Sequence, residues 1–108
     1  MNFENEIFTI ISNGGDAKAI AYEALESAYN GDFKIAEEKL QEAEKVLNVA
    51  HNTQTKLIQH ELNHDGVDIS LLMVHAQDHL MTAISEISLI EQMIKLLRRI
   101  DALEKQQN

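Results

Sequence analysis

Apolar residues recur every three or four positions through three stretches of the chain, the spacing of helices that pack along one face. In the first stretch these positions are Phe3, Ile7, Ile10, Ile11, Ala17, Ile20, Ala21, Ala24, Leu25 and Ala28. The run Asn13-Gly14-Gly15 interrupts them, and Asp16 is a residue type that caps helix starts. The pattern therefore predicts a first helix that is bent or made of two pieces and that ends at Asn30-Gly31.

A second helix is predicted to begin after Asp32, which is placed to cap it. Its apolar face consists of Phe33, Ala36, Leu40, Ala43, Leu47, Ala50, Leu57 and Ile58. The short link at Asn30-Gly31 makes the first two helices antiparallel neighbours. The pattern thins beyond Thr55, and residues 59–66 are polar with a glycine at the end, so we expect a fraying helix end and a mobile loop there.

A long third helix is predicted from a cap at Asp68 or Ser70 to about Glu104. One row of apolar positions follows it in steps of three and four, and we call this row the inner seam. It consists of Met73, Ala76, Leu80, Ala83, Ile87, Ile90, Ile94 and Leu97. We expect the inner seam to pack on the first two helices and to form the core of the subunit.

A second row with the same steps runs along another side of this helix, and we call it the outer seam. It consists of His75, His79, Thr82, Glu86, Leu89, Met93, Leu96, Ile100 and Leu103. A three-helix monomer needs only one buried seam, and an apolar strip left in water is unusual in a soluble monomer. The second half of the outer seam therefore predicts self-association, with His75 and His79 at a cleft edge on the subunit boundary.

Composition supports one all-α domain over residues 1–108. The chain has no proline, no tryptophan and only four glycines, whereas helix-forming residues dominate. A chain of 108 residues is too short for a deep cleft of its own, so we expect function on a surface or between subunits. The absence of cysteine excludes disulfides, cysteine-ligated zinc and thiol chemistry.

The net charge of the chain limits the kinds of molecule that it can bind. The formal net charge is −9, from 18 acidic and 9 basic residues, which disfavours nucleic acids and anionic membranes and favours proteins with basic faces. The start Met1-Asn2-Phe3-Glu4 has neither the basic residues nor the apolar run of a signal peptide, so we expect a cytoplasmic protein without a membrane span.

The most unusual feature is the placement of His75, Asp78 and His79 in the most apolar helical run of the chain. Neutral imidazole is a good nucleophile, and His75 stands five residues after Ser70, near the helix end that favours anions. Both facts suit phosphoryl carriage, although a helical histidine often only makes a polar contact. The i, i+3, i+4 spacing would also allow a zinc site. However, Asp78 lies about 60° from His75, away from His79 and between Val74 and Met81.

The run Val74-His75-Ala76-Gln77-Asp78-His79, continued by Leu80-Met81-Thr82, resembles the active-site segment of one protein family. That family is the lactose/cellobiose-type enzyme IIA of the bacterial phosphoenolpyruvate-dependent sugar phosphotransferase system. Two further segments match it, Gly14-Gly15-Asp16-Ala17 and Ala28-Tyr29-Asn30-Gly31-Asp32-Phe33. The resemblance covers nearly the whole chain.

The resemblance implies a homotrimer of three-helix antiparallel bundles. In it, the tele nitrogen of His75 accepts a phosphoryl group from the phosphocarrier protein HPr and passes it to a cysteine of enzyme IIB during disaccharide uptake. Asp78 matches an aspartate that meets its symmetry mates around one Mg²⁺ ion. Gln77 and His79 match positions that line the phosphorylation site, and the alternative is that they only tune the interface. The sugar itself does not touch this subunit.

Two other classes are open on the residues alone. Residues 24–40 are similar to one tetratricopeptide hairpin, a peptide-binding module, but a second repeat is absent and solenoids need several. A purely structural coiled-coil oligomer explains both seams of the third helix. It gives no reason for His75, Asp78 and His79 to lie there.

Overall fold

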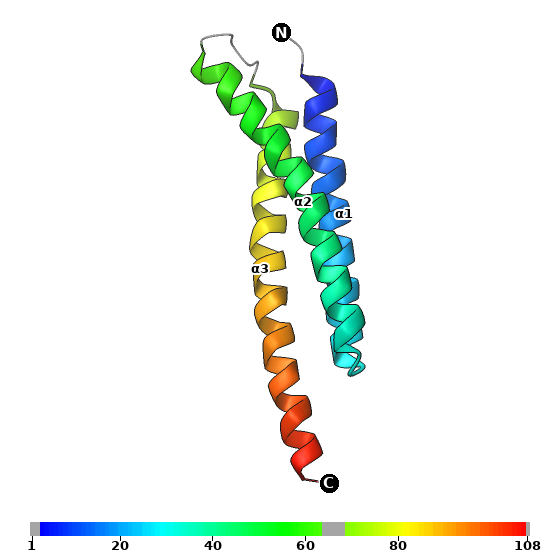
Figure 1. Cartoon of the computed structure of the whole chain (residues 1–108). Helices are drawn as coiled ribbons and strands as arrows, with labels where there is room; N and C mark the ends of the chain where they lie inside the picture. The colour runs from blue at the N-terminus through cyan, green and yellow to red at the C-terminus, as the bar shows by residue number, and fades with distance from the viewer. Residues whose placement is uncertain (1–2, 64–68, 108) are drawn as a thin grey trace.

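The computed structural model describes residues 3–63 and 69–107, which form three helices. They are α1 (Glu4–Tyr29), α2 (Phe33–Leu62) and α3 (Leu71–Gln106). Helices α1 and α3 run in the same direction and α2 runs against them (Figure 1). The described part of the chain contains no strand. The prediction of an all-α three-helix antiparallel bundle is confirmed.

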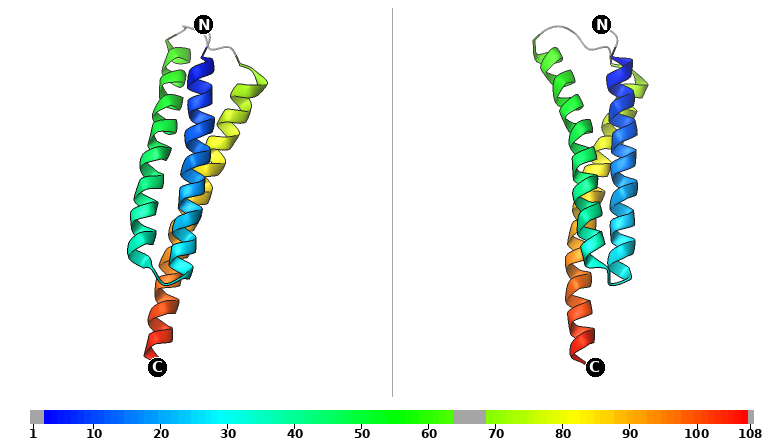
Figure 2. Two further views of the ribbon diagram at one scale, coloured as in Figure 1. Left: turned by 90° about the vertical axis from the view of Figure 1, so that its right-hand side faces the viewer. Right: turned by 45° about the vertical axis from the view of Figure 1, so that its right-hand side comes forward.

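Helix α1 packs against both of the other helices, whereas α2 and α3 contact each other least. The left view of Figure 2 shows α1 between α2 and the N-terminal part of α3, which diverges from α2. The molecule is elongated, with extents of 63 × 20 × 18 Å. The C-terminal turns of α3 project beyond the α1–α2 turn (Figures 1 and 2).

The predicted break in the first helix is wrong, because α1 is continuous through Gly14 and Gly15. A glycine inside a helix costs only about 1 kcal/mol relative to alanine, and packing over 26 residues easily outweighs this. Asn13 does not leave the helix either, because its Nδ2 donates to the carbonyl of Thr9 at 3.0 Å. Asp16 is consequently an exposed residue inside α1 and caps nothing.

The turn and the caps follow the sequence more closely. Gly31 has a φ of 81°, a left-handed conformation that favours glycine, and it reverses the chain between α1 and α2. The Asp32 side chain accepts from the backbone N–H of Ile35 at 3.3 Å, as a cap should. Ser70 caps α3 by accepting from the N–H of Met73 at 3.1 Å. The alternative cap Asp68 lies outside the described residues.

The end of α2 is more regular than expected. The helix continues to Leu62, so the fraying predicted from residue 59 is wrong up to that point. Asn63 donates its backbone N–H to the carbonyl of Gln59 at 3.0 Å, which closes the last turn. The rest of the expected loop, residues 64–66, lies outside the described residues.

The inner seam forms the core, as predicted. Seven of its eight residues are buried, and Leu97 is partly buried. Fully buried alanines of α1 and α2 face it and let the helices approach closely: Ala17, Ala21, Ala24, Ala36, Ala43 and Ala50. The apolar half of the outer seam stays in water, with Leu89, Met93, Leu96, Ile100 and Leu103 each 43% to 61% exposed.

Candidate functional site

His75 and His79 form a stacked pair near the start of α3. Their ring centroids lie 5.8 Å apart, and the ring planes differ by 25°. His75 is exposed and His79 is partly buried. The stacking follows from the i, i+4 spacing, which places the two side chains one above the other on a helix. The ring of His75 therefore lies at the surface and stacks on the ring of His79.

The ring of His79 rests against the glycine pair of α1. A Cβ atom built on Gly15 would lie 3.4 Å from Nε2 of His79, and one built on Gly14 would lie 3.7 Å from its Cδ2. The two glycines therefore give the imidazole a flat surface without side chains. The sequence signal was visible as Gly14-Gly15, but it marks a close approach between helices and not a break in one.

A polar cluster lies further along the contact between α1 and α3. The Tyr22 hydroxyl donates to Oε1 of Glu86 at 2.7 Å, and Nζ of Lys18 lies 3.3 Å from Oε2 of Glu86. The hydrogen bond from Tyr22 and that from Lys18 lower the pKa of Glu86, and the hydrogen bond to Glu86 raises the pKa of Tyr22. The sequence placed Glu86 in the outer seam, but it did not identify Lys18 or Tyr22, whose signal is only tertiary.

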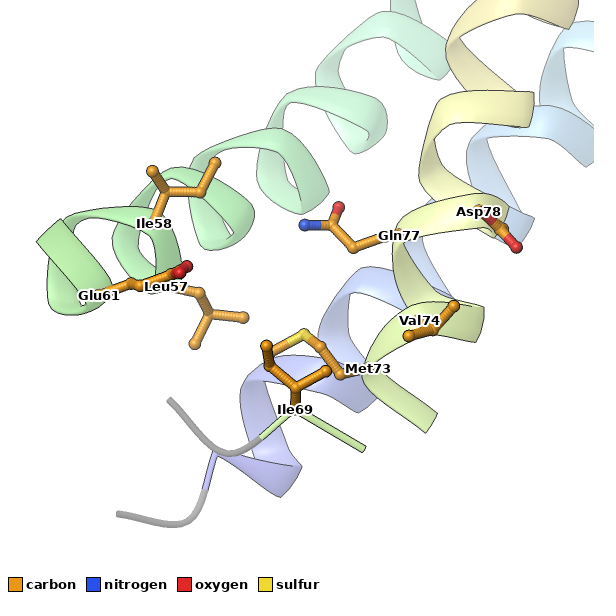
Figure 3. Close-up of a pocket in the computed structure, with 8 residues that line it drawn as sticks. All are labelled: Leu57, Ile58, Glu61, Ile69, Met73, Val74, Gln77 and Asp78. Atoms are coloured by element: carbon orange, nitrogen blue, oxygen red, sulfur yellow. The ribbon is translucent and has the colours of Figure 1, made fainter. Parts of the chain in front are cut away.

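Asp78 lies on a different flank of α3, as its spacing predicted. Its carboxylate is exposed, and its neighbours one turn away, Val74 and Met81, are 46% and 55% exposed apolar residues. The side chain borders a largely apolar cavity of about 250 Å³ between the end of α2 and the start of α3 (Figure 3). Asp78 does not line the shallow hollow that Leu71, Leu72 and His75 border.

Gln77 is directed toward α2. Its side-chain carbonyl accepts a hydrogen bond from the amide of Gln54, and Figure 3 shows Gln77 extending from α3 toward the cavity. Within one subunit the structure therefore does not bring Gln77 beside His75 and His79. A spacing of two residues corresponds to about 200° around a helix, which explains the separation.

The zinc alternative finds no support. Among residues 3–63 and 69–107, no three histidine or acidic side chains are grouped so that they could hold a metal ion. Asp78 lies on its own flank of α3, and among the described residues it belongs to no such group.

These features define a class of small helical domain with an exposed histidine on an open surface of its longest helix. The family model described as "PTS system, Lactose/Cellobiose specific IIA subunit" matches residues 5–98. The chain therefore belongs to the lactose/cellobiose-specific IIA subunits of the sugar phosphotransferase system, as the resemblance implied. It is a phosphotransferase component, and the peptide-binding and purely structural alternatives are not favoured.

Relatives of known name agree with this assignment. The chain is 44% identical over 102 residues to the lichenan-specific phosphotransferase enzyme IIA component of Bacillus subtilis, covering 93% of each chain. It is 39% identical over 99 residues to the N,N'-diacetylchitobiose-specific IIA component of Escherichia coli, covering 92% of this chain and 85% of the relative.

Solved structures share the fold. The crystal structure of the cellobiose-specific enzyme IIA from Bacillus anthracis superimposes with a TM-score of 0.89 at 40% identity, covering 94% of both chains. The IIA(chitobiose) chain from the Escherichia coli IIA–HPr complex superimposes with a TM-score of 0.81 at 37% identity, covering 94% of this chain and 98% of that one. No described helix of the present structure is both long and apolar enough to cross a bilayer.

Proposed function

We propose that His75 carries the phosphoryl group, accepting it from HPr and passing it to a cysteine of enzyme IIB. The observation that supports this most is the exposed His75 ring, stacked on His79 near the capped start of α3. An approaching protein can reach the ring directly. The nearby helix start also favours a negatively charged group.

The reaction requires little machinery. The tele nitrogen of His75 attacks phosphorus, and one N–P bond forms while the N–P bond of the donor phosphohistidine breaks. The positive charge that the His75 ring gains is the one that the donor ring gives up. The thiolate of enzyme IIB then attacks, forming an S–P bond and releasing neutral His75. Because each carrier is already activated, the domain needs only to position the group and to keep water away.

The surroundings of His75 suit protein partners. Leu71 and Leu72, which border a shallow hollow together with His75, are exposed apolar residues at the start of α3. Such residues, on a chain with a net charge of −9, fit an interface with a basic protein. The similarity to the IIA chain of an IIA–HPr complex supports HPr as the donor. Enzyme IIB follows as the acceptor from the role of a IIA subunit.

We further propose a homotrimer in which the outer seams meet and the three Asp78 carboxylates approach the symmetry axis. Three like charges there would repel one another unless some are protonated or a cation binds. Carboxylate oxygens suit a hard ion such as Mg²⁺, which would be structural. No transfer step requires it, because His75 lies on another flank of α3.

In the proposed trimer, Gln77 can line the phosphorylation site of a neighbouring subunit, although it does not lie beside His75 within its own subunit. His75 and Gln77 lie on opposite sides of Asp78 around α3. An axis next to Asp78 therefore turns the His75 side of each subunit toward the Gln77 side of the next. On this proposal His79 supports the site from its own subunit and Gln77 lines it across the boundary. The disaccharide, of the lactose, cellobiose or chitobiose type, never contacts the domain, and the relay operates in the cytoplasm.

The relay can be reconstituted to test this function. Phosphoenolpyruvate, enzyme I and HPr should label the wild-type chain, and adding a chitobiose- or cellobiose-type enzyme IIB should remove the label. His75→Ala should accept none, whereas His51→Ala, an exposed histidine of α2, should behave as wild type. Equal labelling of the two variants would overturn the assignment of His75.

A further inference from the structure

The C-terminal part of α3 carries charges as well as the apolar half of the outer seam. Residues 89–107 contain seven charged side chains, and five of them form ion pairs within the subunit. These pairs are Lys95 with Glu91, Lys105 with Asp101, and Arg98 with Glu37 of α2. The other two, Arg99 and Glu104, are exposed and have no ion-pair partner in the described part of the chain. This segment is therefore left with one cation and one anion.

Arg99 and Glu104 lie on opposite flanks of the outer seam, which passes here through Leu96, Ile100 and Leu103. By helix geometry, Arg99 lies about 70° to one side of the seam and Glu104 about 70° to the other. In heptad terms Ile100 and Leu103 occupy positions a and d, so Arg99 occupies position g and Glu104 the next position e. The two side chains are about 140° apart around the helix, so they cannot meet within one subunit.

A parallel neighbouring helix would bring the two flanks together. In a parallel coiled coil, position g of one helix lies across from the following position e of its neighbour, five residues further on. That is the spacing from Arg99 to Glu104. The preceding g and e positions are occupied by Gln92 and Leu97, which are uncharged. In an antiparallel arrangement g would face g and e would face e, so like charges would meet.

We propose that Arg99 of one subunit forms an ion pair with Glu104 of the next, and that this pair makes copies of the chain associate in parallel. The inference rests on the proposed homotrimer. The last turns of α3 project beyond the α1–α2 turn, so a neighbouring α3 can reach both flanks (Figure 1). Glu104 also borders a hollow at that turn, but its side chain stays exposed. Around a threefold axis each boundary contains the same pair, so neither charge is left without a partner.

Charge reversal tests this ion pair. Glu104→Arg places like charges at every boundary, which should weaken association about fivefold per boundary and about a hundredfold for three chains. The same change makes the chain less negative, so an effect of net charge alone would strengthen association instead. Arg99→Glu should weaken association by a similar factor, and both changes in one chain should restore it. The losses should shrink in about 1 M salt, which screens exposed charges.

Two matched variants serve as controls in sedimentation equilibrium and cross-linking. Lys105→Glu changes the charge by as much as Arg99→Glu in the same turns, but on the side of α3 opposite the outer seam, so the association constant should not change. The chain contains no cysteine, so introduced cysteines can report the orientation. Leu103→Cys should form disulfide-linked chains under mild oxidation, because d positions of parallel helices meet. Ala102→Cys, which lies away from the seam, should not.

The results that would overturn the proposal differ from those that would overturn the homotrimer. The ion pair is wrong if the wild type associates and Glu104→Arg weakens association no more than Lys105→Glu does, or if the double reversal does not restore it. Parallel association is wrong if Leu103→Cys links chains no more than Ala102→Cys does. A wild-type chain that sediments as a monomer would overturn the homotrimer, and this inference with it. Phosphorylation of His75 is measured separately and does not affect these outcomes.

Discussion

The apolar half of the outer seam allows a sharp test of self-association. Met93 and Leu96 lie at its centre and are 43% and 61% exposed in the single subunit. Changing both to lysine places two charges on this surface without touching the inner seam. If the outer seams of several subunits pack together, each new charge would be buried without a partner, and the assembly should dissociate.

The size of the effect follows from the exposed fractions. Fully burying a leucine, isoleucine or methionine side chain is worth about 1.5–3 kcal/mol, so covering the exposed half of one gives about 1 kcal/mol. Five such residues contribute about 5 kcal/mol per subunit. The double substitution removes about 2 kcal/mol of this, and each unpaired buried charge costs several kcal/mol more. Because micromolar association corresponds to about 8 kcal/mol, the variant should be monomeric at such concentrations.

Sedimentation equilibrium over a range of concentrations measures the mass directly. The control is the double variant Ile35→Lys and Val49→Lys, which changes two exposed apolar residues of α2, 41% and 47% exposed, in a row that also contains Glu42 and Lys56. It should keep the wild-type mass. If the Met93 and Leu96 variant also keeps it, the outer seam is not the association surface. Circular dichroism should show that both variants remain helical.

Three further predictions concern single positions. Asp78→Leu should abolish stoichiometric metal in elemental analysis while the oligomeric mass persists, because apolar replacements of buried charges are often tolerated; unchanged metal content would place the cation elsewhere. Tyr22→Phe should raise the pKa of Glu86 toward its ordinary value, as measured by a carboxyl NMR titration. Because Glu86 has a lowered pKa when folded, the stability that Tyr22→Phe removes should be present at neutral pH and should disappear as the pH falls below about 4.5; a loss that grows in acid would contradict the assigned hydrogen bond. Gly15→Ala should raise the melting temperature through its helix propensity, worth up to about 1 kcal/mol, yet slow phosphoryl transfer by covering Nε2 of His79; a lower melting temperature would mean that the helices cannot accommodate the methyl group.

The features predicted correctly from the sequence are those that depend on angles around one helix. The inner seam is buried, the apolar half of the outer seam is exposed in the single subunit, and Asp78 lies between Val74 and Met81, because the spacing of residues alone determines which side of a helix they occupy. The caps at Asp32 and Ser70 were also predicted, since capping depends on residues within one turn.

The features that were missed depend on contacts between helices. Gly14-Gly15 weakens a helix locally, and nothing nearby in the sequence reveals that His79 packs on it from α3. The pairing of Lys18 and Tyr22 with Glu86 likewise requires the register between α1 and α3. Gln77 is a different case: it lies two residues from His75 in the sequence, but helix geometry places it on another side of α3.

Locating the phosphoryl group is the most direct test of the central claim. The wild-type protein should be phosphorylated by phosphoenolpyruvate, enzyme I and HPr, then fragmented under alkaline conditions that preserve phosphohistidine and examined by mass spectrometry. The account predicts one acid-labile phosphoryl group per chain, located on His75, and none on the His75→Ala variant. A phosphoryl group on His79, His51 or His60, or labelling that persists in His75→Ala, would contradict it.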